Sequence, residues 1–252
     1  MSDLAPTIRE RYDHVLGTIA GAAGKARRPP ESVRLVVVTK LQPVSVIRAA
    51  IEAGAGILGE NYAEEAVPKM EAIAALMSQT TAAGRVEWHM IGHVQRRKAA
   101  LVASHFALIH SLDSLRLAQR LDRLAGEVER DLPVLLEFNV GGEAGKEGWD
   151  AADEYTWPSL LPDAEAIAAL PRLKIKGLMT MPPLVSDPED ARVYFRRLRG
   201  LRDFLAARVP GAAWTELSMG TSVDYPVAVE EGATLVRVGE AILGPRPAAE
   251  AA

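Results

Sequence analysis

A single lysine ends the first strongly apolar run of the chain. Leu35 to Val38 form an unbroken apolar stretch. Thr39 and Lys40 follow it directly, and Pro43 comes three residues after Lys40. Such a run is typical of a strand covered on both faces, as in a parallel sheet, and Pro43 suits the start of a helix. Lys40 therefore lies at a strand-to-helix junction. Its amine is either a solvated group at a sheet edge or a Schiff-base nucleophile, which burial or a neighbouring cation would activate.

Two short loops near the end of the chain have the residue types of an anion-binding site. Residues 218–222 (SMGTS) and 237–240 (RVGE) each lead from an expected strand into an expected helix. Backbone N–H groups at a helix N-terminus bind anions, and the hydroxyls of Ser218, Thr221 and Ser222 can add hydrogen bonds. By itself the first loop fits a phosphate site and a simple helix cap equally well. The sequence contains no Walker A and no dinucleotide-binding glycine pattern.

These residues need a scaffold, and the hydrophobic pattern predicts one. An amphipathic helix from about Pro6 to Ala26 comes first, and strand-like runs then alternate with helical segments. Eight strands are expected, at residues 35–39, 56–60, 86–92, 106–110, 132–140, 173–179, 215–218 and 234–238. We therefore predict a single α/β domain over residues 1–247, a (β/α)8 TIM barrel with an extra N-terminal helix, and a flexible tail at 248–252. An open doubly wound sheet is the alternative.

In such a barrel the chemistry gathers at the carboxyl ends of the strands, and the loops after the last two strands are the usual phosphate site. Lys40 ends the first strand, the two small-residue loops follow the seventh and eighth, and Arg237 lies beside them. Together they suggest pyridoxal 5'-phosphate (PLP) held as a Schiff base. A barrel enzyme that uses a lysine Schiff base toward a carbonyl substrate remains open on these residues alone.

Six ordered motifs resemble the YggS/PROSC family of pyridoxal phosphate homeostasis proteins. They are VVTK at 37–40, GENY at 59–62, WHMIGHVQ at 88–95, GLMTMP at 177–182, LSMGTS at 217–222 and VRVG at 236–239. The resemblance spans nearly the whole chain. It implies a barrel like the N-terminal domain of alanine racemase, with PLP as the cofactor and Lys40 as the Schiff-base residue.

The resemblance also implies roles for the other site residues. It implies phosphate contacts from five residues, namely Ser218, Gly220, Thr221, Gly239 and Glu240. It places Arg237 against the pyridine nitrogen and Asn61 near the ring. We also count His89 and Met179 among the cofactor-binding residues, with His89 as a hydrogen-bonding residue of the barrel mouth and Met179 packing the barrel top. An arginine cannot accept the pyridinium proton, so the ring would be a weak electron sink, which suits a carrier better than an enzyme.

The resemblance favours a non-catalytic protein that holds PLP and delivers it to PLP-dependent apo-enzymes. The alternative is a PLP-dependent amino-acid racemase, in which Lys40 would be one of two opposed acid-base groups. By resemblance, such a racemase needs a further C-terminal β-domain with an opposing tyrosine, and we expect none after residues 245–252.

Some residues depart from the family pattern. His93 and Arg97 stand where the family often has proline and asparagine, and Gly141–Gly142 replaces a small polar and acidic pair. We expect these changes to affect partner contacts rather than the cofactor. Lys146 is a candidate for transient PLP attachment. His89 and His93 are four residues apart, but strand alternation turns their rings apart, so we expect no metal site.

The composition excludes several classes of protein. The 252 residues have a formal net charge of -4, which argues against a nucleic-acid partner despite local basic clusters. There are no cysteines, which excludes disulfides, thiolate metal sites and a cysteine nucleophile. No apolar run approaches the roughly 18 residues of a membrane span. We therefore expect a cytoplasmic protein, and we expect it to be a monomer.

Overall fold

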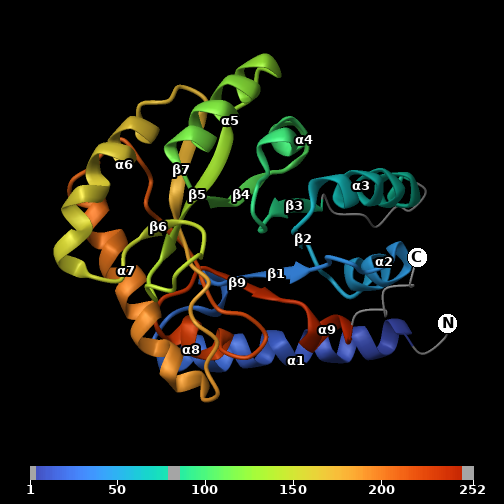
Figure 1. Cartoon of the computed structure of the whole chain (residues 1–252). Helices are drawn as coiled ribbons and strands as arrows, with labels where there is room; N and C mark the ends of the chain where they lie inside the picture. The colour runs from blue at the N-terminus through green and yellow to red at the C-terminus, as the bar shows by residue number, and fades with distance from the viewer. Residues whose placement is uncertain (1–3, 79–85, 246–252) are drawn as a thin grey trace.

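Eight parallel strands close into a barrel, with helices around the outside (Figure 1). The computed structural model describes residues 4–78 and 86–245. The barrel strands are β1 (Arg34–Val38), β2 (Ile57–Glu60), β3 (Glu87–Met90), β4 (Leu108–Leu112), β5 (Leu132–Asn139), β7 (Leu173–Met179), β8 (Glu216–Ser218) and β9 (Leu235–Val238). Strand β1 pairs with both β2 and β9, and a parallel β4–β5 pairing completes the ring. The predicted (β/α)8 barrel is confirmed, and the doubly wound alternative is wrong.

The helices of the described residues follow the strands in chain order. They are α1 (Leu4–Lys25), α2 (Val44–Glu52), α3 (Ala63–Met77), α4 (Ala99–His105), α5 (Leu115–Glu127), α6 (Leu161–Ala168), α7 (Arg192–Ala206), α8 (Tyr225–Glu230) and α9 (Glu240–Leu243). Helix α1 precedes the first strand, as predicted, and lies along α8 and α9 (Figure 1). None of these helices is long and apolar enough to cross a membrane.

Strand alternation divides the core into two parts. Leu35 and Val37 of β1 face the surrounding helices, whereas Val36 packs inside the barrel against Leu135, Met179 and other inner side chains. Met179 is 1% exposed and belongs to this inner apolar cluster. Its predicted place at the barrel top, near the cofactor, stays a prediction.

The structure contains short elements that the sequence pattern did not predict. The glycine-rich segment after β5 contains a two-residue strand, β6 (Trp149–Asp150), which pairs with β5 outside the ring. Helix α7 is preceded by a 3-10 turn (Pro188–Ala191) that the Asp187 side chain caps. The predicted tail at 248–252 and the domain end at 247 lie outside the described residues.

Candidate functional site

Lys40 stands at the carboxyl end of β1, half-buried, beside a buried polar network. The Thr39 hydroxyl donates to Glu60 Oε1 at 2.8 Å. Lys69 Nζ, on α3, donates to the Thr39 carbonyl at 3.0 Å and to Glu60 Oε1 at 3.0 Å. This network joins β1, β2 and α3, and it fixes the backbone from which the Lys40 amine extends.

A second contact fixes the loop beyond the lysine. Leu41 has a positive φ of 60°, and its amide donates to Glu65 Oε1 at 2.8 Å. Glu65 also pairs with Lys69, at 2.5 Å. Burial raises the pKa of Glu60, and the Lys69 ammonium opposes this shift. Glu60 Oε2 has no hydrogen-bond partner within the described residues. The loop that carries Lys40 is therefore held by hydrogen bonds to Glu65 and to Lys69, and Lys69 forms a buried ion pair with Glu60.

Two glycines let the anion-binding loops approach their neighbours closely. Gly220 has a φ of +91°, and a β-carbon there would lie 2.6 Å from Ala228 Cβ and 2.9 Å from Tyr225 Cα. A β-carbon at Gly239 would lie 3.2 Å from Val38 Cβ. The loop before α9 is therefore in contact with the strand that carries Lys40, only two residues before the lysine.

These loops contain backbone donors without partners. The amides of Gly220, Ser222 and Glu240 donate to no acceptor in the described part of the chain. Both donors of Thr221 are occupied, because its amide and its hydroxyl bond Asp224 Oδ1 at 2.6 and 3.1 Å. Unpaired amides in a concave loop of small residues fit a phosphate group.

Arg237 is a buried cation between the two loops. Its NH1 donates to Ser218 Oγ at 2.5 Å, and its NH2 donates to the Thr180 carbonyl at 2.9 Å and to Met181 Sδ at 2.9 Å. Burial lowers its pKa to about 10, so the guanidinium stays charged at neutral pH. Because Val36 pairs with Arg237 in the β1–β9 ladder, the arginine lies on the strand next to that of Lys40. A fixed positive charge therefore lies one strand away from β1, in contact with Ser218 and with the end of β7.

Ser218 and Asn61 occupy different environments. The Ser218 hydroxyl is fully buried and bonds both Arg237 and His110, so it faces the barrel interior. Asn61 follows β2, and its Oδ1 is buried without a partner within the described residues. A β-carbon at Gly92 would lie 2.8 Å from Asn61 Cβ, so a close approach of the β3 loop fixes Asn61. Asn61 thus retains an acceptor for a ligand, whereas the Ser218 side chain does not.

The prediction that His89 lies at the barrel mouth is wrong. His89 is the third residue of a four-residue strand, and its ring lies in the inner part of the barrel, 1% exposed. It borders a cavity of about 820 Å³ that the first residues of several strands line, among them Arg34, Glu87 and Glu216. The sequence motif runs on to Gln95, whereas β3 already ends at Met90. The sequence therefore did not show where along the barrel axis His89 lies, and we predicted the wrong end.

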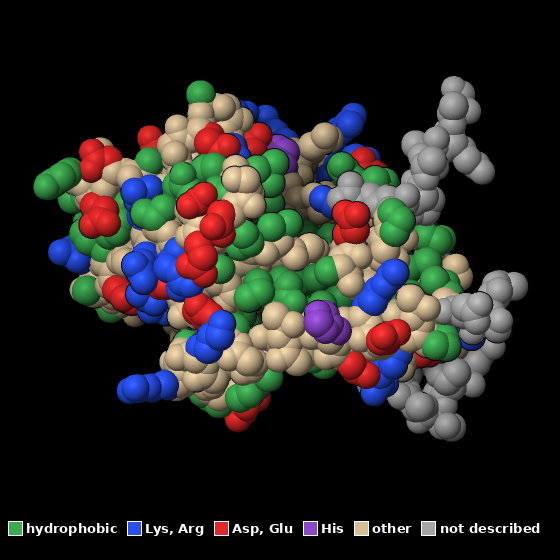
Figure 2. Space-filling view, turned by 90° about the horizontal axis from the view of Figure 1, so that it is seen from below, with side chains coloured by type: hydrophobic (Ala, Val, Ile, Leu, Met, Phe, Trp, Pro, Cys, Tyr) green, Lys and Arg blue, Asp and Glu red, His purple; other side chains and the backbone are tan. Residues whose placement is uncertain are grey.

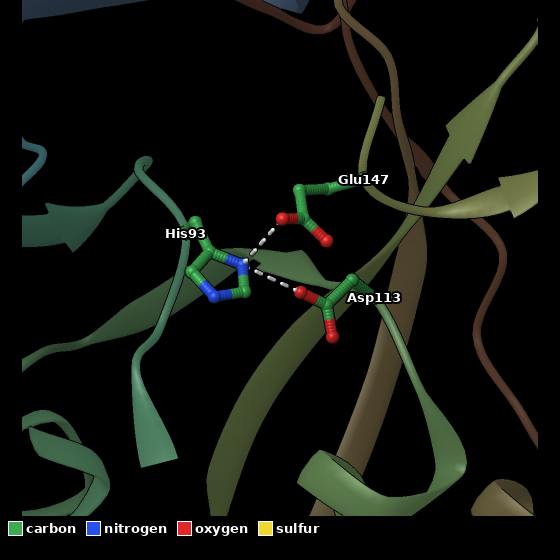
Figure 3. Close-up of side chains that lie close together, drawn as sticks. All are labelled: His93, Asp113 and Glu147. Atoms are coloured by element: carbon green, nitrogen blue, oxygen red, sulfur yellow. Dashed lines mark hydrogen bonds and ion pairs between the residues drawn. The ribbon is translucent and has the colours of Figure 1, made fainter. Parts of the chain in front are cut away.

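His93 lies instead at the carboxyl ends of the strands. Its Nδ1 lies 2.9 Å from Asp113 Oδ2 and 3.7 Å from Glu147 Oε1 (Figure 3). The ligating atoms of these three side chains all lie within 4.8 Å of one another. Because Asp113 holds the His93 nitrogen in a hydrogen bond and the other two side chains are about half exposed, we interpret the group as an ion-pair cluster.

Sequence reasoning missed Glu137, which lies on β5 near this cluster. Burial and the neighbouring Asp113 raise its pKa to about 7, with Arg237 opposing the shift. One sequence signal could have identified it. Glu137 is the single acidic residue of the expected strand at 132–140, at a position where strand alternation turns the side chain inward. Lys146, predicted as a transient PLP acceptor, donates to the carbonyls of Met181 and Pro182 at 3.0 and 3.2 Å and pairs with Glu143. Its role stays a prediction.

A basic groove of about 650 Å³ lies between α5 and the loop after β3. Four arginines line it, namely Arg96, Arg116, Arg120 and Arg123. The side chains of Arg96 and Arg116 make no hydrogen bond or ion pair within the described residues. By contrast, the face in Figure 2 carries acidic and basic side chains close together. The groove begins at His93 and Asp113, which follow the carboxyl ends of β3 and β4.

Comparison with known proteins identifies the family. The profile of the family "Alanine racemase, N-terminal domain" matches residues 22–247. A pyridoxal phosphate homeostasis protein of Vibrio alginolyticus is 38% identical over 240 residues, 95% of this chain and 98% of that protein. One of Aquifex aeolicus is 40% identical over 238 residues, 94% and 97% of the two chains. The chain belongs to the pyridoxal phosphate homeostasis protein family. The family prediction from the six motifs is confirmed.

Solved structures agree with this family. PipY of Synechococcus elongatus PCC7942, solved with PLP bound, superposes with a TM-score of 0.77 at 35% identity, over 94% of this chain and all of that chain. A Bifidobacterium adolescentis protein gives 0.87 at 36% identity, over 96% of each chain. An alanine racemase of Clostridium difficile 630 gives 0.65 at 13% identity, over 98% of this chain and 59% of that one, which shows a shared fold alone.

Proposed function

We propose that this protein binds PLP at the carboxyl ends of its strands, through Lys40, and serves PLP homeostasis in the cytoplasm. The observation that carries the proposal is the adjacency of β8, β9 and β1. It groups an amine, a buried guanidinium and two loops with unpaired amides at one end of the barrel. The PLP-bound structure of PipY, a relative at 35% identity, supports the same ligand.

Each residue would have a distinct role. The amides of Gly220, Ser222 and Glu240 would hold the phosphate, with Gly239 allowing the close approach of that loop. We transfer the hydroxyl contacts predicted for Ser218 and Thr221 to these amides, because Arg237 and Asp224 already hold the hydroxyls. Arg237 would donate to the ring nitrogen and, being already protonated, leave that nitrogen without a proton. Bound covalently to Lys40, the cofactor aldehyde is withheld from other amines.

We propose that the protein is a carrier rather than an enzyme. An arginine partner leaves the ring nitrogen unprotonated, and an unprotonated ring has less of the electron-withdrawing power on which PLP catalysis depends. The stiff loop around Lys40 supports tight retention of the cofactor. We include in this proposal that the protein acts as a monomer, which light scattering of the purified protein tests.

Delivery to apo-enzymes requires a surface near the site. The basic groove supports an acidic surface of the recipient enzyme as partner, because Arg96 and Arg116 are free of protein carboxylates in the described residues. The overall charge of -4 disfavours a general polyanion such as nucleic acid. The groove begins at the carboxyl ends of β3 and β4, the end of the barrel that carries the site, so a partner bound there would lie on the side of the released cofactor.

Absorption spectroscopy tests the central bond. We expect the purified protein with added PLP to show the visible band of a lysine–PLP adduct, which borohydride fixes on Lys40 in peptide maps. Lys40→Ala should lose the band and the label, whereas Lys146→Ala should keep both. A band that survives in Lys40→Ala, or a label spread over surface lysines, would overturn the proposal.

A further inference from the structure

A chain of buried side chains crosses the barrel interior from Arg237 to the opposite end. Arg237 NH1 lies 2.5 Å from Ser218 Oγ, which lies 2.8 Å from His110 Nδ1. His110 Nε2 lies 3.0 Å from His89 Nδ1, and His89 Nε2 lies 3.5 Å from Glu87 Oε2. These five residues lie on four strands, β9, β8, β4 and β3. The contacts form a continuous path between the candidate site and the cavity at the amino ends of the strands.

The side chains along this path are buried, except for Glu87 at the far end. Ser218 and His110 are 0% exposed, His89 is 1% and Arg237 is 4%, whereas Glu87 reaches the surface. Burial lowers the pKa of His89 to about 4 and that of His110 well below its ordinary value, so both rings are neutral at pH 7. A neutral imidazole carries one N–H and one acceptor nitrogen. The two touching rings therefore have two possible arrangements of their protons.

In the first arrangement every donor finds an acceptor. Arg237 can only donate, so Ser218 Oγ accepts from it and donates its own hydrogen to His110 Nδ1. His110 then carries its proton on Nε2 and donates to His89 Nδ1. His89 in turn carries its proton on Nε2, which faces the Glu87 carboxylate. All donors point the same way, from the guanidinium toward the carboxylate.

The reverse arrangement leaves two faults. If His89 donated to His110, then His110 would donate to Ser218 through Nδ1, and the buried Ser218 hydrogen would have no acceptor among the contacts above. The unprotonated His89 Nε2 would also face the Glu87 carboxylate, acceptor against acceptor. A buried donor without a partner is costly enough to disfavour this arrangement by more than about tenfold.

We propose that His89, His110 and Ser218 form a one-directional hydrogen-bond chain, with both histidines in the Nε2–H tautomer, that positions the Arg237 guanidinium. The role toward the cofactor rests on the proposed function. Ser218 orients NH1 and the Thr180 carbonyl orients NH2, which fixes the plane of the guanidinium. His110 keeps the Ser218 lone pair turned toward Arg237, and His89 keeps His110 in the required tautomer. His89 and His110 are thus positioning residues that lie away from the ligand.

The surrounding charges agree with this polarity. Arg237, Arg34 and the neighbouring His89 oppose a positive charge on His110. Two carboxylates, Glu87 and Glu216, favour a positive charge on His89, whereas Arg34 opposes it. Burial has the largest effect and keeps the His89 ring neutral. Arg34 and Glu216 also pair with each other at 2.8 Å. The cavity end of the chain therefore lies between a carboxylate acceptor and a balanced ion pair.

Nuclear magnetic resonance of the cofactor-free, 15N-labelled full chain tests the tautomers directly. Long-range 1H–15N correlations distinguish Nε2–H, Nδ1–H and doubly protonated rings. We expect two of the histidines to give the neutral Nε2–H pattern unchanged from pH 6 to pH 8, and His89→Gln and His110→Gln each to remove one of them. An Nδ1–H or doubly protonated ring at either position in the wild-type protein would overturn the chain. The tautomer pattern itself is read from the wild-type protein without cofactor, and the two variants serve only to assign the signals.

A second measurement tests the positioning role. His110→Leu removes the acceptor of the Ser218 hydrogen, and we expect about tenfold weaker PLP binding with a shifted absorption band. We expect His110→Asn to restore part of both, because its amide can accept the same hydrogen bond. His105→Leu is the matched control, since this exposed histidine bonds only the Leu101 carbonyl at 3.0 Å. Equal PLP affinity and band position in His110→Leu and His105→Leu would refute the role. If the wild type binds no PLP, the proposed function fails while the tautomers still decide the chain.

Discussion

The ion pair beneath the Lys40 loop gives a quantitative prediction. In Lys69→Met, Glu60 keeps its carboxylate at 0% side-chain exposure but loses its cation, which lies 3.0 Å away in the wild type. Removing one partner of a buried pair costs about 3–5 kcal/mol. For a chain of this size each kcal/mol lowers Tm by about 2–4 °C. We therefore expect Lys69→Met to melt at least about 6 °C below the wild type at pH 8.

The loss depends on pH with a defined sign. The pKa of Glu60 is already raised in the folded state, and removing Lys69 raises it further. A folded-state pKa above the unfolded value means that the folded state binds more protons, so stability falls as pH rises through that interval. At pH 4.5, the ordinary pKa of this side chain, Glu60 is mostly protonated in the folded state and half protonated in the unfolded state, so little of the difference remains. Most of the loss should therefore disappear when the melts are repeated at pH 4.5.

Two further variants separate this cause from loss of side-chain packing. Lys98→Met makes the same substitution at a more exposed pair, 2.9 Å from Glu64, and should cost less than about 1 kcal/mol. Adding Glu60→Gln to Lys69→Met removes the stranded charge and should recover most of the stability at pH 8. A loss that is equal at both pH values, or that matches Lys98→Met, would refute the reasoning.

Two predictions concern the binding surfaces. Gly220→Ala should weaken PLP binding by more than about tenfold, because φ there is +91° and the new β-carbon would lie 2.6 Å from Ala228; Gly21→Ala, with nothing within 4 Å, is the control. Wild-type affinity in Gly220→Ala would contradict the loop geometry. Arg96→Glu combined with Arg116→Glu should slow transfer to an apo-enzyme at low salt, leave the absorption spectrum unchanged and show a smaller effect at high salt. Transfer as fast as in an Arg48→Glu control would contradict the docking surface.

The periodicity of the sequence predicted the barrel because each strand and helix carries its own local signal. Runs such as Leu35 to Val38 predict covered strands, and the regular alternation with helices predicts closure. The two-residue strand β6 was not predicted, because it is too short to form an apolar run and its pairing with β5 depends on the path of the loop. Lys40, Gly220, Arg237 and Gly239 could be grouped from their strand-end positions, because parallel strands end at one face.

The contacts inside the barrel could not be predicted in this way. His110 and Ser218 are 108 residues apart, and their contact depends on the stagger between strands, which alternation does not specify. The register shift within the β4–β5 pairing changes which residues of β4 face inward. The same uncertainty along the barrel axis placed His89 at the wrong end. Sequence patterns therefore identify which residues face inward more securely than how far along the axis they lie.

The energetics of Arg237 show why such a chain suits a binding site. A buried guanidinium destabilises a fold unless its donors are satisfied, and here Ser218 and the Thr180 carbonyl satisfy two of them without neutralising the charge. A carboxylate hydrogen-bonded to the guanidinium would have cancelled much of its positive field. Within the hydrogen-bond chain, the neutral histidines behind Ser218 supply acceptors and no opposing charge. The carboxylates of Asp224 and Glu137 favour the charged form of Arg237 and partly offset the effect of burial on its pKa. The arrangement thus keeps Arg237 both oriented and positive, which an anionic or electron-rich ligand requires.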